Sequence, residues 1–249
     1  MFIPYRDDNP RILTPYVTYA ILALNILVFL FQLGLGNSSL AEYEFTLNYG
    51  LIPAKTIGID NDTIIREHEV NLRRLTRQPI SLEAQPHSPL LTIFTSMFMH
   101  GGLGHLLFNM LFLWIFADNM ESGLGHRRFA IFYLACGVGA ALIQIIMNLH
   151  STTPMIGASG AIAGVLGAYM FRYPRARVHV FVFLLFFITT LRVPAFVVLG
   201  IWFLTQLTNG LGSIGINTTG GVAWFAHIGG FLTGVLLDRL FLRIRFERY

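Results

Sequence analysis

The feature that most constrains this chain is a series of apolar segments, most of them long enough to cross a lipid bilayer. They cover approximately residues 15–35, 90–117, 129–149, 158–171, 194–209 and 223–241. A helix needs about 20 apolar residues to cross the hydrocarbon core. Inside a membrane the backbone finds no water, so a spanning chain forms helices or a closed barrel. The segments therefore predict an all-α, polytopic membrane protein with six transmembrane helices.

Composition excludes most classes of soluble protein. Charged residues make up 12% of the chain and hydrophobic residues 54%, whereas a soluble domain has about 25% charged residues. The net charge of +4 does not indicate nucleic-acid binding, because the basic residues form short clusters beside apolar segments. The single cysteine, Cys136, excludes an internal disulfide and a cysteine-rich zinc site. The expected environment is a lipid bilayer, with no nucleic-acid partner.

The first apolar segment is expected to stay in the protein as a transmembrane helix. Asp7 and Asp8 precede it, and no clear small-residue cleavage site follows, so it does not resemble a signal peptide. The predicted organisation is a cytoplasmic N-terminal segment 1–14, a six-helix membrane domain 15–241 with a large outer loop at about 36–89, and a basic cytoplasmic tail 242–249.

The apolar stretch 178–191 is treated as a loop. It has 14 residues, which as a helix would extend about 21 Å, too short for a hydrocarbon core of about 30 Å. Arg177 and Arg192 flank it, as expected of an interfacial or a re-entrant segment.

The distribution of arginine predicts the orientation. With six spans and an inner N-terminus, the inner segments carry Arg6, Arg11, Arg127, Arg128, Arg172, Arg175, Arg177, Arg192, Arg239, Arg243, Arg245 and Arg248. The short outer loops near 150–157 and 210–222 carry no Lys or Arg. Positive charge stays on the cytoplasmic side of membrane proteins. We therefore expect a multi-pass protein of a prokaryotic inner membrane with both termini cytoplasmic.

Ser159 is a candidate nucleophile at the outer start of the fourth apolar segment. It lies in the sequence Gly157-Ala158-Ser159-Gly160. The first N–H groups of a helix lack partners within the helix, so they can hold an oxyanion beside an exposed hydroxyl. The alternative is a small-residue surface, continued by Gly164, on which two helices pack. This short motif by itself does not decide between the two.

His227 is a candidate general base at the start of the sixth apolar segment. Gly230 and Gly234 follow it, and this spacing lets one membrane helix approach another closely. The alternative is an interfacial histidine bonded to a carbonyl group.

The predicted topology connects the two candidates. One inward-running span begins at Ser159 and the next begins at His227, so both lie at the same depth in the outer half of the membrane. The segment 158–171 is short for a spanning helix. Ser159 is therefore expected below the membrane surface, in a water-filled cavity open to the outside.

The second apolar segment contributes two further polar residues. His105 and Asn109 are four residues apart and share one helix face, from which both can donate hydrogen bonds to an oxyanion. The alternatives are that Asn109 holds helices together and that His100 and His105 bind metal. No His-Glu-x-x-His motif, second carboxylate or cysteine joins this cluster, so no metal or other cofactor is expected.

No acidic residue is predicted near His227. Asp118 and Glu121 fall at the inner end of the second segment and Asp238 near the inner end of the sixth. A Ser–His dyad is therefore expected in place of a triad, and Glu121 is interpreted as structural.

Three motifs together resemble the rhomboid family of intramembrane serine proteases. They are His100-x4-His105-x3-Asn109, Gly157-x-Ser159-Gly160 and Ala226-His227-x2-Gly230-x3-Gly234. The resemblance implies a six-helix bundle in which Ser159 attacks the scissile carbonyl and His227 is the general base. It implies oxyanion support from Asn109, His105, Gly157 and Ala158, and site-shaping helix packing at Gly160, Gly230 and Gly234. It also implies single-span membrane proteins as substrates, and no cofactor.

Two departures from the family pattern leave questions open. Ala163 occupies the position, four after the serine, where an aromatic residue often stacks on the histidine, so the residue that orients His227 is undetermined. The Trp-Arg pair of the first loop is absent. By analogy the fifth span, with Trp202 and Phe203, is expected to act as a lateral gate, and the alternative is that these residues pack in the core or against lipid. Competing functions are a catalytically inactive, client-binding relative and a membrane transporter.

Overall fold

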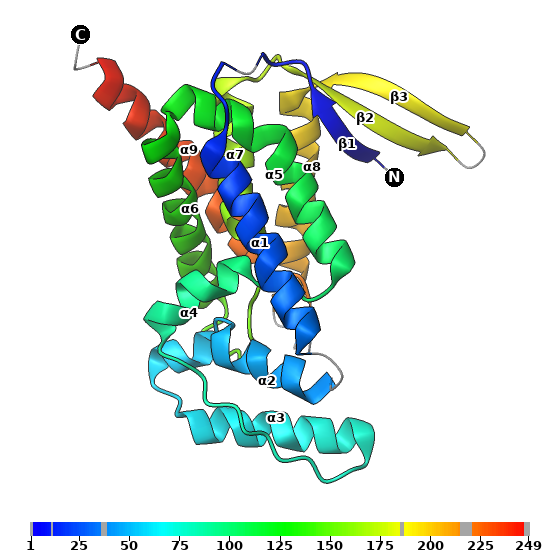
Figure 1. The fold of residues 1–249 in the computed structure, drawn as a ribbon, viewed down its shortest axis with the longest axis vertical. Helices are drawn as coiled ribbons and strands as arrows, with labels where there is room; N and C mark the ends of the chain where they lie inside the picture. The colour runs from blue at the N-terminus through cyan, green and yellow to red at the C-terminus, as the bar shows by residue number, and fades with distance from the viewer. Residues whose placement is uncertain (1, 11, 36–38, 185–186, 215–220, 247–249) are drawn as a thin grey trace.

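In the described part of the chain, six helices stand side by side in the computed structural model (Figure 1). They are α1 (Tyr16–Gly34), α5 (Leu103–Leu124), α6 (His126–Met147), α7 (Ser159–Arg172), α8 (Ala195–Gly212) and α9 (Trp224–Phe246). The structure describes all residues except 1, 11, 36–38, 185–186, 215–220 and 247–249. Within that part, α1, α5, α6 and α8 are long and apolar enough to cross a membrane by themselves. The predicted polytopic helical bundle is confirmed.

The short helix α7 lies at the centre of the bundle. It has 14 residues, and ten consecutive ones, from Gly160 to Tyr169, are buried. It contacts α5, α6, α8 and α9. A helix surrounded by other helices contacts protein instead of lipid. Its small residues therefore let the neighbouring helices pack closely against it.

The second predicted span differs from the observed helix. Residues 90–117 were expected to be continuous, but Pro89–Thr95 forms the separate short helix α4 and Ser96–Phe98 the 3₁₀ turn η2. α5 begins only at Leu103, after a turn in which Gly102 has φ +157°. This backbone conformation is one that glycine adopts readily and other residues rarely do, so the chain breaks here.

The prediction that 178–191 is a loop is wrong for the residues that the structure describes. Arg177–Leu184 and Phe187–Pro194 form the antiparallel strands β2 and β3, and β1 (Phe2–Asp7) pairs with β2. The alternate residues Val178, Val180 and Val182 are buried, which is the period of a strand with one covered face. The sheet lies at the end of the bundle where α1 begins and α9 ends (Figure 1).

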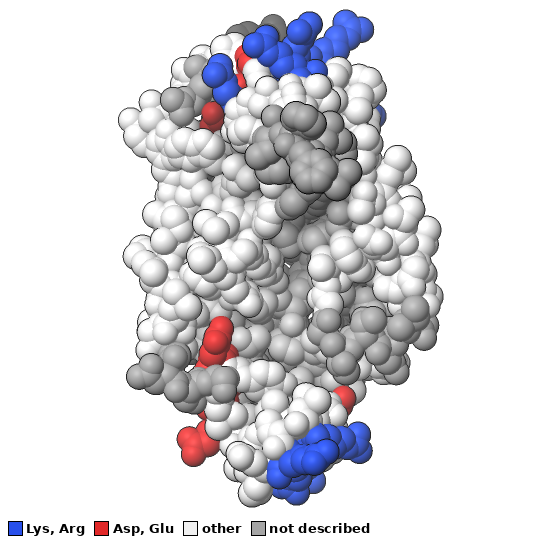
Figure 2. Space-filling model, turned by 90° about the vertical axis from the view of Figure 1, so that its right-hand side faces the viewer, with Lys and Arg blue, Asp and Glu red and all other residues white. Residues whose placement is uncertain are grey.

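The predicted outer loop contains helices of its own. α2 (Ser39–Tyr49), the 3₁₀ turn η1 (Pro53–Ile57) and α3 (Asn61–Thr76) lie at the end of the bundle opposite the sheet (Figure 1). A small separate core, centred on Leu47, Ile52 and Ile64, holds them together. On the face that Figure 2 displays, charged residues gather near the two ends, and an uncharged band lies between them.

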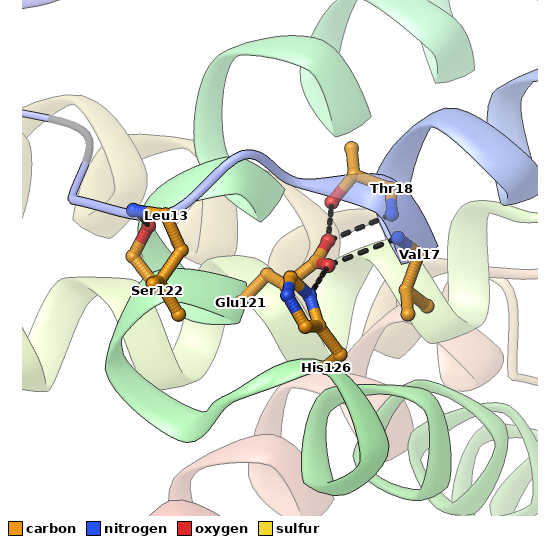
Figure 3. A network of polar contacts seen from close by, with 6 residues as sticks. All are labelled: Leu13, Val17, Thr18, Glu121, Ser122 and His126. Carbon is orange, nitrogen blue, oxygen red and sulfur yellow. Dashed lines mark hydrogen bonds and ion pairs between the residues drawn. The ribbon is translucent and has the colours of Figure 1, made fainter.

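Glu121 ties the beginning of α1 to the turn between α5 and α6 (Figure 3). Its carboxylate is fully buried and accepts from the N–H groups of Val17 at 2.9 Å and Thr18 at 2.8 Å, and from the Thr18 hydroxyl at 2.7 Å. His126 Nδ1 lies 2.5 Å away. A carboxylate at a helix N-terminus meets otherwise unpaired N–H groups and the positive end of the dipole. Glu121 is structural, as interpreted from the sequence.

Candidate active site

Glycines bring α7 and α9 into backbone contact. A Cβ on Gly230 would lie 1.9 Å from the carbonyl oxygen of Gly160, and a Cβ on Gly234 would lie 1.9 Å from that of Gly164. Neither distance is possible for a real side chain, so only glycine permits this spacing. Two of the three predicted packing glycines, Gly160 and Gly230, therefore face each other, and the third lies one turn further along.

This contact places Ser159 beside His227. Ser159 is the first residue of α7, and His227 lies in the first turn of α9. Ser159 Oγ is 2.8 Å from His227 Nε2. The His227 side chain is buried, with the residue 9% exposed. The serine and the histidine thus share a hydrogen bond between α7 and α9.

The second nitrogen of His227 contacts α8. Gln206 Oε1 lies 2.7 Å from His227 Nδ1, and Gln206 Nε2 donates to the Trp202 carbonyl at 3.2 Å. The Trp202 ring centroid lies 5.9 Å from that of the His227 ring. Ala163 is fully buried in the core.

The sequence analysis did not single out Gln206. A signal for it existed, since a glutamine within the apolar segment 194–209 is a polar residue in a span and therefore a functional candidate.

The backbone before Ser159 is held in a conformation that requires glycine. Gly157 has φ +130°, and a Cβ there would lie 2.9 Å from the His105 ring. Its N–H donates to the Ser96 carbonyl at 2.8 Å, so this N–H, predicted to support an oxyanion, is already paired. In the described part of the chain, the N–H groups of Ala158 and Ser159 donate to no acceptor. They are the remaining backbone candidates.

His105 and Asn109 both line the cavity that contains Ser159 and His227. His105 Nδ1 accepts from the Gly101 N–H at 3.4 Å, which leaves Nε2 as the protonated, donating nitrogen. Asn109 is 7% exposed, and its Nδ2 atom has no hydrogen-bond partner within the described residues. Buried amide groups are nearly always paired, so this donor is available to a group that enters the cavity.

The cavity has a volume of about 600 Å³ and mostly apolar walls. Helices α5, α7, α8 and α9 and the segment 154–157 contribute to it. Its volume is in the range of sites that bind small molecules or short peptide segments. Ser159 lies in the wall of this cavity.

His100 takes part in anchoring α1. Its N–H donates to Gln32 Oε1 at 3.0 Å, and Gln32 Nε2 donates to its carbonyl at 3.1 Å. Its ring lies edge-on to His105, with centroids 5.1 Å apart. Across the described ranges, no three His, Cys, Asp or Glu side chains are grouped so that they could hold a metal ion.

Comparison with known proteins places the chain in a family. A model of the Rhomboid domain matches residues 87–244, a range that covers all the site residues described above. The chain belongs to the rhomboid family. The resemblance inferred from the three motifs is confirmed.

Several rhomboid proteins are similar to this chain. RHOMBOID-like protein 1 of Arabidopsis thaliana is 25% identical over 237 residues, 92% of this chain and 54% of the relative. Rhomboid protein 1, mitochondrial, of Saccharomyces cerevisiae is 31% identical over 152 residues, 59% of this chain and 40% of the relative. Rhomboid protease GluP of Bacillus subtilis is 37% identical over 79 residues, 32% of this chain and 15% of the relative. The matched region spans about half or less of each relative.

Proposed function

We propose that this rhomboid is an intramembrane serine endopeptidase with Ser159 as nucleophile and His227 as general base. The observation that carries the proposal is the 2.8 Å contact between Ser159 Oγ and His227 Nε2, made inside a helical bundle. Further support comes from relatives whose names describe them as rhomboid proteases, GluP and, as putative, YdcA, both of Bacillus subtilis.

The first half of the reaction follows from this geometry. His227 Nε2 takes the hydroxyl proton of Ser159 while Oγ bonds to the scissile carbonyl carbon, whose oxygen becomes an oxyanion. The unpaired Asn109 amide, His105 Nε2–H and the Ser159 N–H are the donors that stabilise this oxyanion. The imidazolium of His227 then gives its proton to the leaving amine as the peptide bond breaks, which leaves an acyl-enzyme.

In the second half, water enters from the cavity and hydrolyses the ester. His227 takes a proton from this water, the hydroxide attacks the acyl carbon, and the proton returns to Ser159 Oγ. The chain thus cycles between free and acylated serine without a cofactor.

The substrates of this reaction are single-span membrane proteins, cut in or near the transmembrane segment. Support comes from the mostly apolar cavity walls and from the position of Ser159 at the beginning of the short central helix α7. A segment that unwinds easily presents its backbone carbonyl to the serine at this depth.

The proposed orientation places both termini in the cytoplasm and the Ser159 end toward the outside of a prokaryotic cell membrane. Its support is the concentration of arginine on the predicted inner segments. A cysteine introduced at exposed Ile12 tests it, since Cys136 is buried. Reaction of that cysteine with a membrane-impermeant maleimide added outside the cell would overturn this orientation.

The experiment that tests the activity is reaction with a fluorophosphonate in detergent and cleavage of a single-span substrate in liposomes. We expect the wild type to be labelled and to cleave, and Ser159→Ala and His227→Ala to do neither at a measurable rate. Ser213→Ala is the matched control, since Ser213 directly follows α8 and its hydroxyl donates to the Gly210 carbonyl of that helix.

A folded wild type that neither labels nor cleaves would contradict the protease proposal and favour an inactive, client-binding rhomboid. Solute flux that survives both catalytic substitutions would favour a transporter.

A further inference from the structure

Gln206 is a buried polar residue in an otherwise apolar helix. It lies in α8 and is 6% exposed. One of its hydrogen-bond partners is in α9 and the other is in α8 itself. Its Oε1 is 2.7 Å from His227 Nδ1, and its Nε2 donates to the carbonyl of Trp202, one turn earlier in α8. A buried amide is costly unless both its oxygen and its nitrogen are paired, and here both are.

These contacts determine which way the amide faces. The NH₂ group needs an acceptor, and the Trp202 carbonyl supplies one. The reverse orientation would place the amide oxygen against this carbonyl oxygen, where the two would repel each other. Oε1 therefore faces His227, and it can only accept a hydrogen bond.

An acceptor at Nδ1 selects one tautomer of the base. The proton of neutral His227 is held on Nδ1 by Gln206, so Nε2 presents its lone pair to the Ser159 hydroxyl 2.8 Å away. This is the protonation state that a general base requires before attack. The other tautomer would place an N–H against the serine hydroxyl and leave the Gln206 oxygen unpaired.

The same helix also restrains the plane of the histidine ring. Trp202 lies beside the His227 ring with centroids 5.9 Å apart and planes at 36°. Trp224 contacts the ring edge-on from α9, at 6.3 Å and 88°. The ring is therefore enclosed by two tryptophans, while the position four after the serine, which is often aromatic in the family, is Ala163.

We infer that Gln206 is the positioning residue of the base, holding His227 in the tautomer and orientation that Ser159 needs, and that Trp202 restrains the same ring from α8. The inference rests on the proposed function. It makes α8 part of the catalytic apparatus, because a displacement of α8 away from α9 removes the acceptor and one ring contact together.

The test compares Gln206→Leu and Gln206→Glu with the control Thr205→Val, whose exposed hydroxyl bonds only to Ile201 of the same helix. The measurements are the rate of fluorophosphonate labelling against pH, and kcat and KM for a single-span substrate. Within the described residues, His105 of α5 is the titratable side chain that interacts electrostatically with His227. No acidic side chain there contacts His227.

We expect Gln206→Leu to lower kcat and the labelling rate by about 10- to 100-fold with KM unchanged, somewhat less than the roughly 10²- to 10⁴-fold effect of a general base itself. Gln206→Glu keeps an acceptor and adds a charge that stabilises the imidazolium. It should retain activity within a few-fold and move the acidic limb of the pH–rate profile to higher pH. Thr205→Val should match the wild type.

The outcomes separate the two proposals. If the wild type labels, and Gln206→Leu labels at the same rate with the same pH profile, the positioning role is wrong while the protease proposal stands. If Gln206→Leu does not fold, Gln206→Glu decides, since an acidic limb that does not move overturns the inference. If the folded wild type does not label at all, the proposed function itself fails.

Discussion

At the scale of single residues, the site combines paired and unpaired polar groups. Ser159, His227 and Gln206 form a continuous chain of hydrogen bonds across three helices. The Asn109 amide nitrogen, by contrast, is buried without a partner among the described residues. An unpaired buried donor costs free energy in the resting protein. In the proposed mechanism this donor gains a partner when negative charge develops on an oxygen in the cavity.

Asn109→Ala should therefore impair the reaction more than the fold. We expect kcat to fall by roughly 10- to 100-fold, near the lower end of the effects seen when one oxyanion donor is removed. The substitution also deletes an unsatisfied group, so thermal stability should not decrease much. Substrate cleavage and thermal unfolding in detergent measure the two effects.

Leu107→Ala is the control for Asn109→Ala, because Leu107 lies on the same helix but is 57% exposed. Unchanged turnover in Asn109→Ala would remove this residue from the oxyanion site.

At the scale of helices, the distance between α7 and α9 decides whether the Ser159 and His227 side chains can contact each other. Gly160, Gly164, Gly230 and Gly234 place backbone against backbone at two successive turns. At the far end of the same two helices, Arg172 pairs with Asp238. The two helices are therefore in contact at several points along their length. Ser159 and His227 lie at the end of the pair nearest the glycines.

Gly234→Ala should separate these helices. Its Cβ would lie 1.9 Å from the carbonyl oxygen of Gly164, and backbone cannot move aside as a flexible side chain can. We expect a loss of stability of about 1–3 kcal/mol, as for other overpacked sites, and slower fluorophosphonate labelling because the Ser159–His227 contact lengthens. Thermal unfolding and labelling rates in detergent measure both.

Gly200→Ala is the matched control, since a Cβ on Gly200 of α8 meets nothing within 4 Å. It should be neutral or stabilise by up to about 1 kcal/mol through helix propensity. If Gly234→Ala behaves in the same way, the glycine contact does not set the helix spacing.

At the scale of the whole molecule, the N-terminal strand β1 is attached to helices α5 and α7 of the bundle. Asp7 of β1 accepts hydrogen bonds from Asn119 of α5 at 3.0 Å and from the hydroxyl of Tyr169 of α7. Burial, together with the nearby Asp118 carboxyl, raises the pKa of Asp7 to about 6, while hydrogen bonding from Tyr169 partly opposes the rise. The N-terminal strand is thus held on the bundle by a carboxyl group that resists ionisation.

Asp7→Asn should therefore stabilise the protein relative to the wild type as pH rises. Between the unfolded pKa of 3.8 and the folded pKa of about 6, the folded state holds a proton that the unfolded chain has lost, so the stability of the wild type falls with increasing pH. The difference in Tm, variant minus wild type, should increase from about pH 4 to pH 7. Unfolding curves in detergent at several pH values measure it.

Asp60→Asn provides a control of opposite sign. The Asp60 carboxylate accepts from the Thr63 N–H at the start of α3, and this hydrogen bond lowers the pKa of Asp60. Its stabilising effect is lost as pH falls, so the difference in Tm for Asp60→Asn should decrease with rising pH. A pH-independent difference for Asp7→Asn would show that Asp7 is not the sensitive group.

Much of the fold was predictable from the sequence by itself, because it depends on local composition. Runs of apolar residues predict membrane helices, because a backbone without water must form its hydrogen bonds internally. Each of the six helices of the bundle overlaps one of these runs. Ser159, His227, His105 and Asn109 stand out because polar groups in such runs are costly, and glycines at a spacing of four predict close helix contact. These signals are all read along a single segment.

The tertiary structure decided what depends on partners distant in the chain. Whether residues 178–191 form strands depended on β1, which supplies hydrogen-bond partners from the opposite end of the sequence. The residues that orient His227 came from α8, through a contact between positions 206 and 227. A hydrogen bond of that kind is set by how helices pack, and neither segment carries a local pattern that specifies it.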